Sequence, residues 1–255
     1  MPWAAPTTLI SAVIRLFSRT HMTARKMNRP PIIVSLGGSL IVPTTGIDIG
    51  FLKQFKTLIS RRITKGDRFV IICGGGSTAR QYQAAAHGVG QLTHEDIDWL
   101  GIHATRLNGH LMRAIFHRQS HPTIIKNPNA PPRFREPILI AAGWKPGWST
   151  DYDAALLASG LGAKTVINLS DVDYVYTADP RKNPYAKPVK RIDWKAFRKL
   201  VGNKWDPGLN APFDPVASEL AERIGLTVKM VRGRSIKDVE CAIADKPFKG
   251  TVIED

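Results

Sequence analysis

The sequence is short of cysteine, of long apolar runs and of acidic residues, and each shortage excludes something. Its two cysteines, Cys73 and Cys241, cannot build a disulfide scaffold and fit a reducing compartment. No segment approaches the roughly 18–20 consecutive apolar residues that span a bilayer, which excludes an integral membrane protein. Cys73 ends an apolar run, so we expect its thiol to be buried as a small hydrophobe.

Acidic residues are outnumbered: 36 Lys and Arg stand against 21 Asp and Glu, a formal net charge of +15. A basic surface suits nucleic acid and small anions such as nucleotides equally, so the charge alone selects no partner. With 43% hydrophobic and 22% charged residues, the composition is that of a folded chain with a full core. Its 255 residues are enough for one large α/β domain or two small ones.

Residues 1–29 differ in kind from the rest of the chain. They contain no acid and one short apolar stretch, 9–17, which Arg15 interrupts. We expect an N-terminal extension outside the fold: a disordered segment, a targeting segment, or sequence upstream of a true start at Met22 or Met27. Residues 30–255 show no repeats or low complexity and predict a single domain.

From residue 31 onward, short apolar runs alternate with amphipathic helical patterns. We expect a helix that begins at Asp48, a long helix over 93–116, and a helix that begins near Asp214 and Pro215. Strands separated by helices of this length lie parallel and are covered on both faces, so the predicted fold class is α/β. The predicted strands are 31–36, 68–73, 137–141, 165–169 and 226–231.

Glycine-rich turns follow three of these strands, at 37–39, 74–77 and 143–150. In α/β folds, ligands bind at the carboxyl ends of the strands. Glycines there let the backbone approach a ligand closely and turn N–H groups toward an anion. Three such turns on one edge predict that more than one phosphate is held. The G-x-x-x-x-G-K-[ST] motif is absent, as is a G-x-G-x-x-G motif after the first strand, so neither a P-loop NTPase nor a Rossmann domain is indicated.

Four segments form one ordered set: GGS at 37–39, GGGSTAR at 74–80, PGWSTD at 146–151 and DVDYVYTADP at 171–180. Together they resemble the amino acid kinase superfamily, most closely its archaeal-type uridylate kinases, and the match extends to about residue 254. The resemblance implies a three-layer αβα sandwich with a mainly parallel sheet, a cytoplasmic hexamer, and transfer of the γ-phosphoryl group of Mg-ATP to UMP. It implies a UMP-binding half at about 30–160 and an ATP-binding half at 161–255.

By that resemblance, ATP is held by the first glycine turn and by the 171–180 segment. Mg²⁺ is expected to come with the ATP phosphates, without a protein ligand set of its own. No specific nucleic acid and no membrane is expected as a partner. The implied ATP-binding residues are Ser35, Gly37, Gly38, Ser39, Gly75, Ser170, Asp171, Tyr176 and Asp179.

The resemblance also assigns the UMP site and the reaction centre. Arg80 is expected to clamp the UMP phosphate, since a guanidinium suits that bidentate contact, and Asp98 to accept from the ribose hydroxyls. Asp151 is expected near the reacting phosphates, and Asp214 to organise the centre while also capping the following helix. The implied catalytic residues are Asp151, Asp214 and Arg80. The implied UMP-binding residues are Gly74, Gly75, Arg80, Asp98, Gly143, Trp144, Gly147, Ser149 and Thr150.

The chain departs from the pattern of the superfamily at Ser35, where most members have a lysine that bridges the phosphates. The missing positive charge must come from elsewhere, and Lys145 and Arg80 are the candidates. Tyr174 replaces a usual glycine, so it either reshapes the adenine pocket or needs a positive φ.

Other functions remain open at this point. Trp144 and Trp148 stand where small or polar residues are commoner, and they either stack on the uracil or narrow the pocket. A kinase of another small phosphate or acid, such as isopentenyl phosphate, lacks the GGGSxAR and PGx[ST]TD pair. A storage protein that binds nucleotides or oxyanions is another alternative: Ser35 and Tyr174 are consistent with it, while the presence of Asp151 and Asp214 argues against it. An RNA-binding regulator rests on charge alone.

Two further patterns are interpreted as parts of the protein surface and not as metal-binding or nucleic-acid-binding sites. His103, His110 and His117 recur every seven residues, about 10.5 Å apart along a helix, which is too far to share a metal. We expect a packed or subunit-facing stripe and thus an oligomer contact. The basic region 182–199, with Trp194 and Phe197, is expected to be a solvated face and not a nucleic-acid patch.

Overall fold

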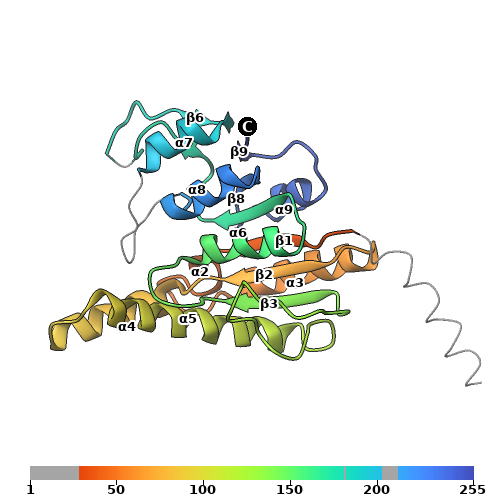
Figure 1. The fold of residues 1–255 in the computed structure, drawn as a ribbon, viewed down its shortest axis with the longest axis horizontal. Helices are drawn as coiled ribbons and strands as arrows, with labels where there is room; N and C mark the ends of the chain where they lie inside the picture. The colour runs from red at the N-terminus through yellow and green to blue at the C-terminus, as the bar shows by residue number, and fades with distance from the viewer. Residues whose placement is uncertain (1–28, 181, 203–211) are drawn as a thin grey trace, which may run out of the picture. The chain divides into compact units, whose positions relative to one another are not determined.

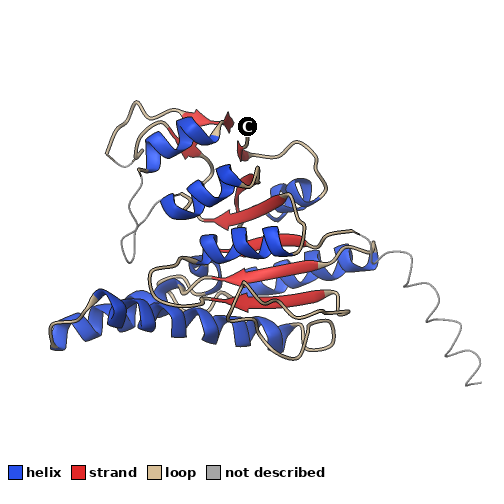
Figure 2. Cartoon of the chain, in the orientation of Figure 1, coloured by secondary structure: helices blue, strands red, loops and turns tan. Residues whose placement is uncertain are grey.

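The computed structural model describes residues 29–180, 182–202 and 212–255 of the chain. Residues 31–255 form one densely connected unit, whose helices and strands are shown in Figures 1 and 2. The predicted N-terminal extension 1–29 lies, apart from Arg29, outside the described residues.

A seven-stranded sheet lies at the centre of this unit, in the order β3-β2-β1-β4-β8-β9-β7. The strands from β3 to β8 are parallel, as expected where helices carry each crossover, while β9 runs antiparallel to β8. The strands are β1 Ile32–Leu36, β2 Phe69–Cys73, β3 Ile138–Ala142, β4 Thr165–Ser170, β7 Arg191–Ile192, β8 Thr227–Arg232 and β9 Gly250–Ile253. A separate two-stranded sheet pairs β5 Val175–Tyr176 with β6 Pro188–Val189.

Helices cover both faces of the sheet, which produces three layers (Figure 2). One core cluster joins the sheet to α3, α5 and α9, and the other joins it to α6, α7 and α8. The α4 helix packs on α5 (Figure 1). The helices are α2 Gly38–Ile41, α3 Ile49–Thr64, α4 Gly76–Val89, α5 His94–Ile115, α6 Thr150–Gly160, α7 Trp194–Val201, α8 Pro215–Arg223 and α9 Ile236–Ile243.

The predicted helix starts are confirmed by their capping contacts. Asp48 caps α3 by accepting a hydrogen bond from the main chain of Phe51, and Asp214 caps α8. Thr93 and Asp96 form a capping box at the start of α5. All five predicted strands are present within one residue of their expected ends. The short strands β5, β6, β7 and β9 were not predicted, because two to four residues are too few for a periodic signal.

Burial settles several sequence-based expectations. The Cys73 side chain is fully buried, as predicted. Trp194 and Phe197 are also fully buried in the core, so they cannot form the aromatic part of a nucleic-acid patch. Among the described residues, no helix combines the length and apolar character that crossing a bilayer requires.

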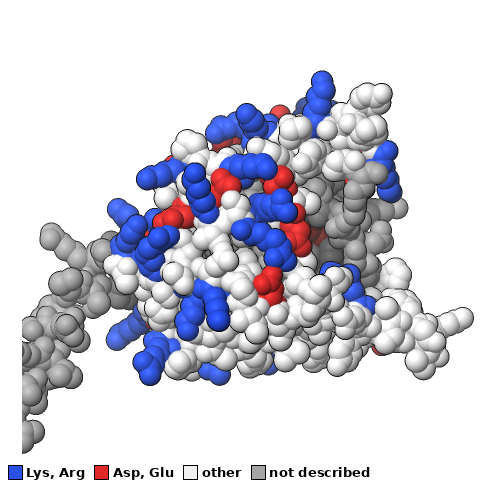
Figure 3. Space-filling view, turned by 180° about the vertical axis from the view of Figure 1, so that it is seen from behind, with Lys and Arg blue, Asp and Glu red and all other residues white. Residues whose placement is uncertain are grey.

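Basic and acidic side chains alternate on the face shown in Figure 3, with Lys and Arg in excess. Among the described residues, Glu240 pairs with Arg61 at 2.6 Å near the surface, and Asp67 pairs with Arg62 at 2.6 Å where both side chains are largely buried. Pairs of this kind at a surface contribute little to stability, typically about 0–1 kcal/mol. Such pairs do lower the effective charge of a surface.

Candidate active site

Two polar side chains interrupt the buried central strands and meet at Asp151. The register of β1 and β4 places Ser35 beside Asn168, and both side chains point to the face that α6 covers. The Ser35 hydroxyl donates to Asp151 Oδ1 at 3.0 Å, and Asn168 Nδ2 donates to the same oxygen at 2.8 Å. Asp151 lies in the first turn of α6, after the capping residue Ser149. The predicted reaction-centre residue is therefore held from two strands at once.

Asp151 and Asp214 form a pair of acids in a site of low polarity. Burial, and then the nearby charge of Asp214, raise the pKa of Asp151 to about 7, against the lowering effect of its three hydrogen bonds. The third of these comes from the main-chain N–H of Asp214, which donates to Asp151 Oδ2 at 3.3 Å. Burial also raises the pKa of Asp214, while its hydrogen bonds to the start of α8 oppose the rise. Asp214 is thus a helix cap, as the sequence predicted, and it contacts Asp151 through its main chain; its role in organising the reaction centre remains a prediction.

The first two glycine turns touch each other through their backbones. A Cβ on Gly38 would lie 2.0 Å from the nitrogen of Gly76, and one on Gly74 would lie 2.6 Å from the nitrogen of Gly38. Gly76 also has a φ of 66°, which side chains disfavour. Asn108 of α5 fixes the second turn by donating to the carbonyls of Gly74 and Gly75. Several of these glycines are therefore required by the close contact of the two turns, which lie next to each other.

The third turn, the acceptor loop 143–149, is tied to α5. The carboxylate of Asp98 accepts a hydrogen bond from the main-chain N–H of Gly147 at 2.7 Å. Gly147 has a φ of 83°, so the loop requires glycine there. Asp98, predicted to bind ribose, therefore lies beside the predicted UMP loop.

Aromatic side chains fill the acceptor loop. The rings of Trp144 and Trp148 stack with centroids 6.2 Å apart, and Trp148 lies 4.2 Å from the Tyr152 ring. The Lys145 ammonium lies 4.3 Å from the centre of the Trp144 ring and 5.7 Å from that of Trp148. Lys145 is thus held over two indoles of its own loop.

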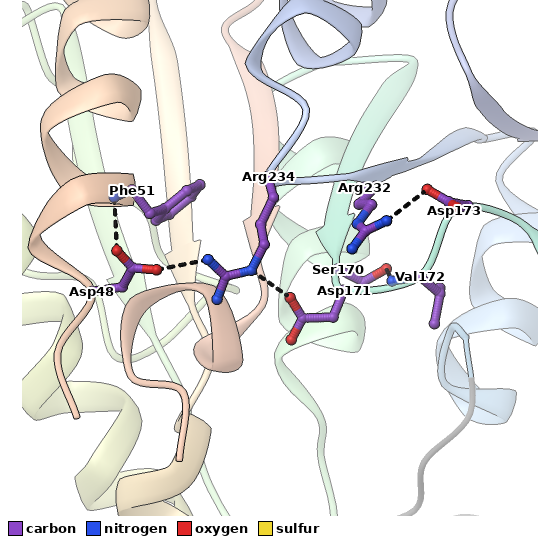
Figure 4. Close-up of polar contacts among 8 residues, drawn as sticks. All are labelled: Asp48, Phe51, Ser170, Asp171, Val172, Asp173, Arg232 and Arg234. Atoms are coloured by element: carbon purple, nitrogen blue, oxygen red, sulfur yellow. Dashed lines mark hydrogen bonds and ion pairs between the residues drawn. The ribbon is translucent and has the colours of Figure 1, made fainter. Parts of the chain in front are cut away.

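On the side predicted to bind ATP, charged residues join three elements (Figure 4). Arg234, after β8, reaches Asp48 Oδ2 at 2.7 Å and Asp171 Oδ1 at 3.6 Å. The Arg232 guanidinium lies 3.4 Å from Asp173. The pKa of Asp48 is lowered first by its hydrogen bond from the main chain of Phe51 and then by Arg234. The pKa of Asp173 is lowered mainly by Lys249, whose ammonium lies 3.0 Å from Asp173 Oδ2, and to a smaller extent by Arg232. The predicted ATP-binding Asp171 is thus ion-paired across the sheet edge.

Two expectations about single residues can be judged directly. Asp245 is the one non-glycine residue with positive φ among the residues described, so Tyr174 does not need that conformation. Its ring packs edge-on to Tyr176, with centroids 6.4 Å apart. Arg80 is exposed on α4, and no side-chain contact to it is found within the described part of the chain. Its predicted role as a phosphate clamp remains a prediction.

Sequence reasoning missed several residues that build this site. Asn168 and Asn108 bind the reaction-centre acid and the second glycine turn, and Thr105, Arg106 and Asp153 contact the acceptor loop. A signal was present in the sequence, because Asn168 is a polar residue inside an apolar strand and Thr105 lies on the buried face of α5. Only the register of the strands and helices shows what these side chains bind.

The acids of the site fit a magnesium ion that arrives with nucleotide phosphates. Asp214 Oδ2 is buried with no hydrogen-bond partner in the described structure, which leaves a hard oxygen donor available. Within residues 29–180, 182–202 and 212–255, no three His, Cys, Asp or Glu side chains cluster as a complete metal site. Magnesium commonly uses one or two carboxylates plus substrate phosphates, and this donor set matches that habit.

Comparisons with known proteins agree with the resemblance in the motifs. Residues 30–231 match the sequence model of the amino acid kinase family. The uridylate kinase of Methanospirillum hungatei is 34% identical over 227 residues, which cover 88% of this chain and 94% of that protein. The uridylate kinase of Hyperthermus butylicus is 32% identical over 223 residues, which cover 84% and 94%.

Solved structures share the fold. The uridylate kinase from Archaeoglobus fulgidus has a TM-score of 0.72 at 24% identity, over 88% of this chain and 99% of that one. The UMP kinase from Bacillus anthracis has a TM-score of 0.71 at 21% identity, over 89% and 97%. The predicted αβα architecture with a mainly parallel sheet is confirmed.

Proposed function

The chain belongs to the amino acid kinase family, and we propose that it is a UMP kinase that transfers the γ-phosphoryl group of ATP to UMP. An oxygen of the UMP phosphate forms a bond to the γ-phosphorus, and the bond to the β–γ bridging oxygen breaks, which yields UDP and ADP. Such transfers need aligned phosphates and neutralised charge more than covalent help from the protein.

The observation that carries this proposal is the position of Asp151. It contacts Ser35, two residues before the first glycine turn, and it follows the acceptor loop directly in the chain. The acid therefore stands where a nucleotide held by one turn meets a nucleotide held by the other. In this arrangement Asp151 and Asp214 orient the reacting groups, and no general base is required.

We assign ATP binding to residues of about 161–255 together with the first glycine turn. Both main-chain N–H groups and side chains contact the nucleotide in this proposal. Gly37, Gly38 and Ser39 supply N–H groups to the phosphates, with Ser35 and Gly75 beside them. Magnesium, when bound with ATP, neutralises phosphate charge, and Asp214 Oδ2 is the oxygen placed to hold it. The proposed adenosine contacts are Ser170, Asp171, Tyr176 and Asp179.

For the UMP-binding half, about 30–160, the acceptor loop and α5 provide the contacts. Asp98 binds the ribose through the carboxylate oxygen that Gly147 does not use. Arg80, exposed on α4, turns to the UMP phosphate, and Thr150 donates to the nucleotide. The other proposed contacts are Gly74, Gly75, Gly143, Trp144, Gly147 and Ser149.

We further propose a cytoplasmic homo-oligomer, with the hexamer as the expected state. His103 and His110 are exposed on α5, with Leu107 on the same face of the helix, and His117 is exposed just after the end of α5. A histidine stripe packed inside the chain is thereby excluded, and a subunit-facing one remains.

The test is ADP release from Mg-ATP by the purified chain, with UMP, CMP, dUMP, AMP and isopentenyl phosphate offered in parallel. Selective turnover of UMP is the expected result. Turnover of isopentenyl phosphate alone would assign the chain to another kinase of the family. ATP binding without turnover of any acceptor would favour a storage or binding protein instead.

A further inference from the structure

In the first two residues after β3, every main-chain N–H and C=O group forms a hydrogen bond with a side chain. Gly143 N–H donates to Thr105 Oγ1 at 2.8 Å, and Trp144 N–H donates to Asp153 Oδ2 at 3.1 Å. Arg106 donates through Nε to the carbonyl of Gly143 at 3.3 Å and through Nη2 to that of Trp144 at 2.9 Å. Loops normally leave part of their backbone to water, so this degree of attachment indicates a fixed position.

Arg106 is suited to this contact by its shape. Its planar fork presents parallel donors to two successive carbonyls, which an ammonium group cannot do. The guanidinium also lies 5.7 Å from the centre of the Trp99 ring, on the preceding turns of α5. The Asp153 carboxyl group, from α6, faces it across the loop. Arg106 is therefore held from its own helix and from the opposite side.

Asp153 is a buried acid that phosphoryl transfer does not use. Its side chain is 1% exposed, and its Oδ1 atom is buried without a hydrogen-bond partner among the described residues. Burial raises its pKa to about 8, against the lowering effects of the Trp144 N–H and of Arg106. A polar group this costly to bury, in contact with the loop alone and near the site, points to a role in placing the loop.

We propose that Arg106 and Asp153 are positioning residues for the acceptor, a pyrimidine nucleoside monophosphate. By fixing both peptide groups of Gly143 and Trp144, they hold the Trp144 indole and its neighbours as a preformed surface for the acceptor base. Preorganisation of this kind lowers the ordering cost of binding. The inference rests on the proposed function and concerns only the UMP side of the site.

The experiment compares Arg106→Ala and Arg106→Lys with Arg113→Ala. Arg113 lies one heptad further along α5, half-buried, and its side chain makes no hydrogen bond or ion pair within the described part of the chain. For Arg106→Ala we expect kcat/KM for UMP to fall about tenfold or more, the usual range for losing charged hydrogen bonds, while KM for ATP stays within about twofold. Arg106→Lys should recover part of the loss, and Arg113→Ala should match the parent protein.

A second pair of variants tests Asp153 without relying on charge. Asp153→Asn keeps an oxygen that accepts from the Trp144 N–H, so its KM for UMP should stay close to that of the parent. Asp153→Ala leaves that N–H without a partner and should raise KM for UMP in the way Arg106→Ala does. Tryptophan fluorescence on UMP titration, without ATP, gives a binding readout that does not depend on turnover.

Each outcome decides something. A parent chain that turns over no UMP overturns the proposed function and this inference with it. A parent that turns over UMP, with Arg106→Ala equal to it in kcat/KM for UMP, overturns this inference alone. Equal losses toward UMP and ATP, accompanied by a lower melting temperature, would mean that Arg106 only stabilises the fold and would likewise overturn it.

Discussion

At the scale of single residues, the site depends on acids placed where water is scarce. Asp151 accepts three hydrogen bonds, yet burial and Asp214 together keep its pKa at about 7, well above the usual 3.8. In much of the superfamily, a lysine stands where this chain has Ser35. A hydroxyl can donate one hydrogen bond to Asp151 but brings no charge, so the acid stays easier to protonate than a lysine-paired one.

Because its pKa is raised, Asp151 should make the stability of the chain depend on pH, and the substitution Asp151→Asn should remove this contribution. In the unfolded chain the carboxyl titrates near 3.9 and in the native chain near 7, so the native state binds more protons between these values. The contribution of Asp151 to the free energy of unfolding therefore falls as pH rises through this window. Relative to the parent, Asp151→Asn should gain on the order of 2–4 kcal/mol between pH 5 and pH 8.

Urea unfolding of both proteins at the two pH values measures this difference. Glu219→Gln is the control, because the Glu219 side chain is 62% exposed and should leave the pH dependence as it is. A difference between Asp151→Asn and the parent that is the same at pH 5 and pH 8 would show that Asp151 titrates normally.

At the scale of elements, the site contains two turns that pack against each other so closely that residues larger than glycine would collide at their points of contact. The turn after β1 and the turn after β2 meet at Gly38, Gly74 and Gly76, backbone against backbone. The parallel pairing of β1 with β2 sets this meeting, because it brings both carboxyl ends to one edge. The glycines are thus required by packing, whichever ligand they also serve.

Gly38→Ala should consequently destabilise the chain by about 1–3 kcal/mol or more, since neither backbone can move aside easily. The matched control is Gly88→Ala in α4, where a Cβ meets nothing within 4 Å. That substitution should stabilise the chain by up to about 0.5–1 kcal/mol, because alanine favours helical backbone more than glycine does. Thermal melting of both variants is the measurement, and equal shifts would argue against contact between the turns.

At the scale of the whole molecule, charge and exposed apolar surface indicate partners. The net charge of +15 is accompanied by ion pairs at the surface and by buried aromatic residues where a nucleic-acid face was conceivable. The exposed stripe of α5, with Leu107 at 62% exposure, is the surface that we propose for contact with a second copy of the chain.

Leu107→Glu should therefore lower the oligomeric state, because a charge placed in an apolar contact must be desolvated. Light scattering coupled to gel filtration measures the mass. Ile49→Glu on α3 is the control, since Ile49 has the same exposed fraction, 62%, and lies away from the stripe. If the parent is monomeric, or if both variants dissociate alike, the stripe is not the interface.

The alternation of strands and helices, the capped starts of α3, α5 and α8, and the glycine turns with their motifs could all be predicted from the amino-acid sequence. These features are local: a period of two or 3.6, or a cap next to its helix, is written in neighbouring residues. The assignment of the family also came from local order, because the four motifs keep their sequence and spacing.

Which side chains meet in the site could not be predicted from the sequence and follows from the three-dimensional packing of the chain. The contact of Ser35 and Asn168 with Asp151 depends on the register of β1 and β4, which are more than a hundred residues apart in sequence. The attachment of the acceptor loop by Arg106 and Asp153 likewise depends on how α5 and α6 pack beside β3. Such pairings arise from burial and close packing of distant segments, and no local pattern encodes them.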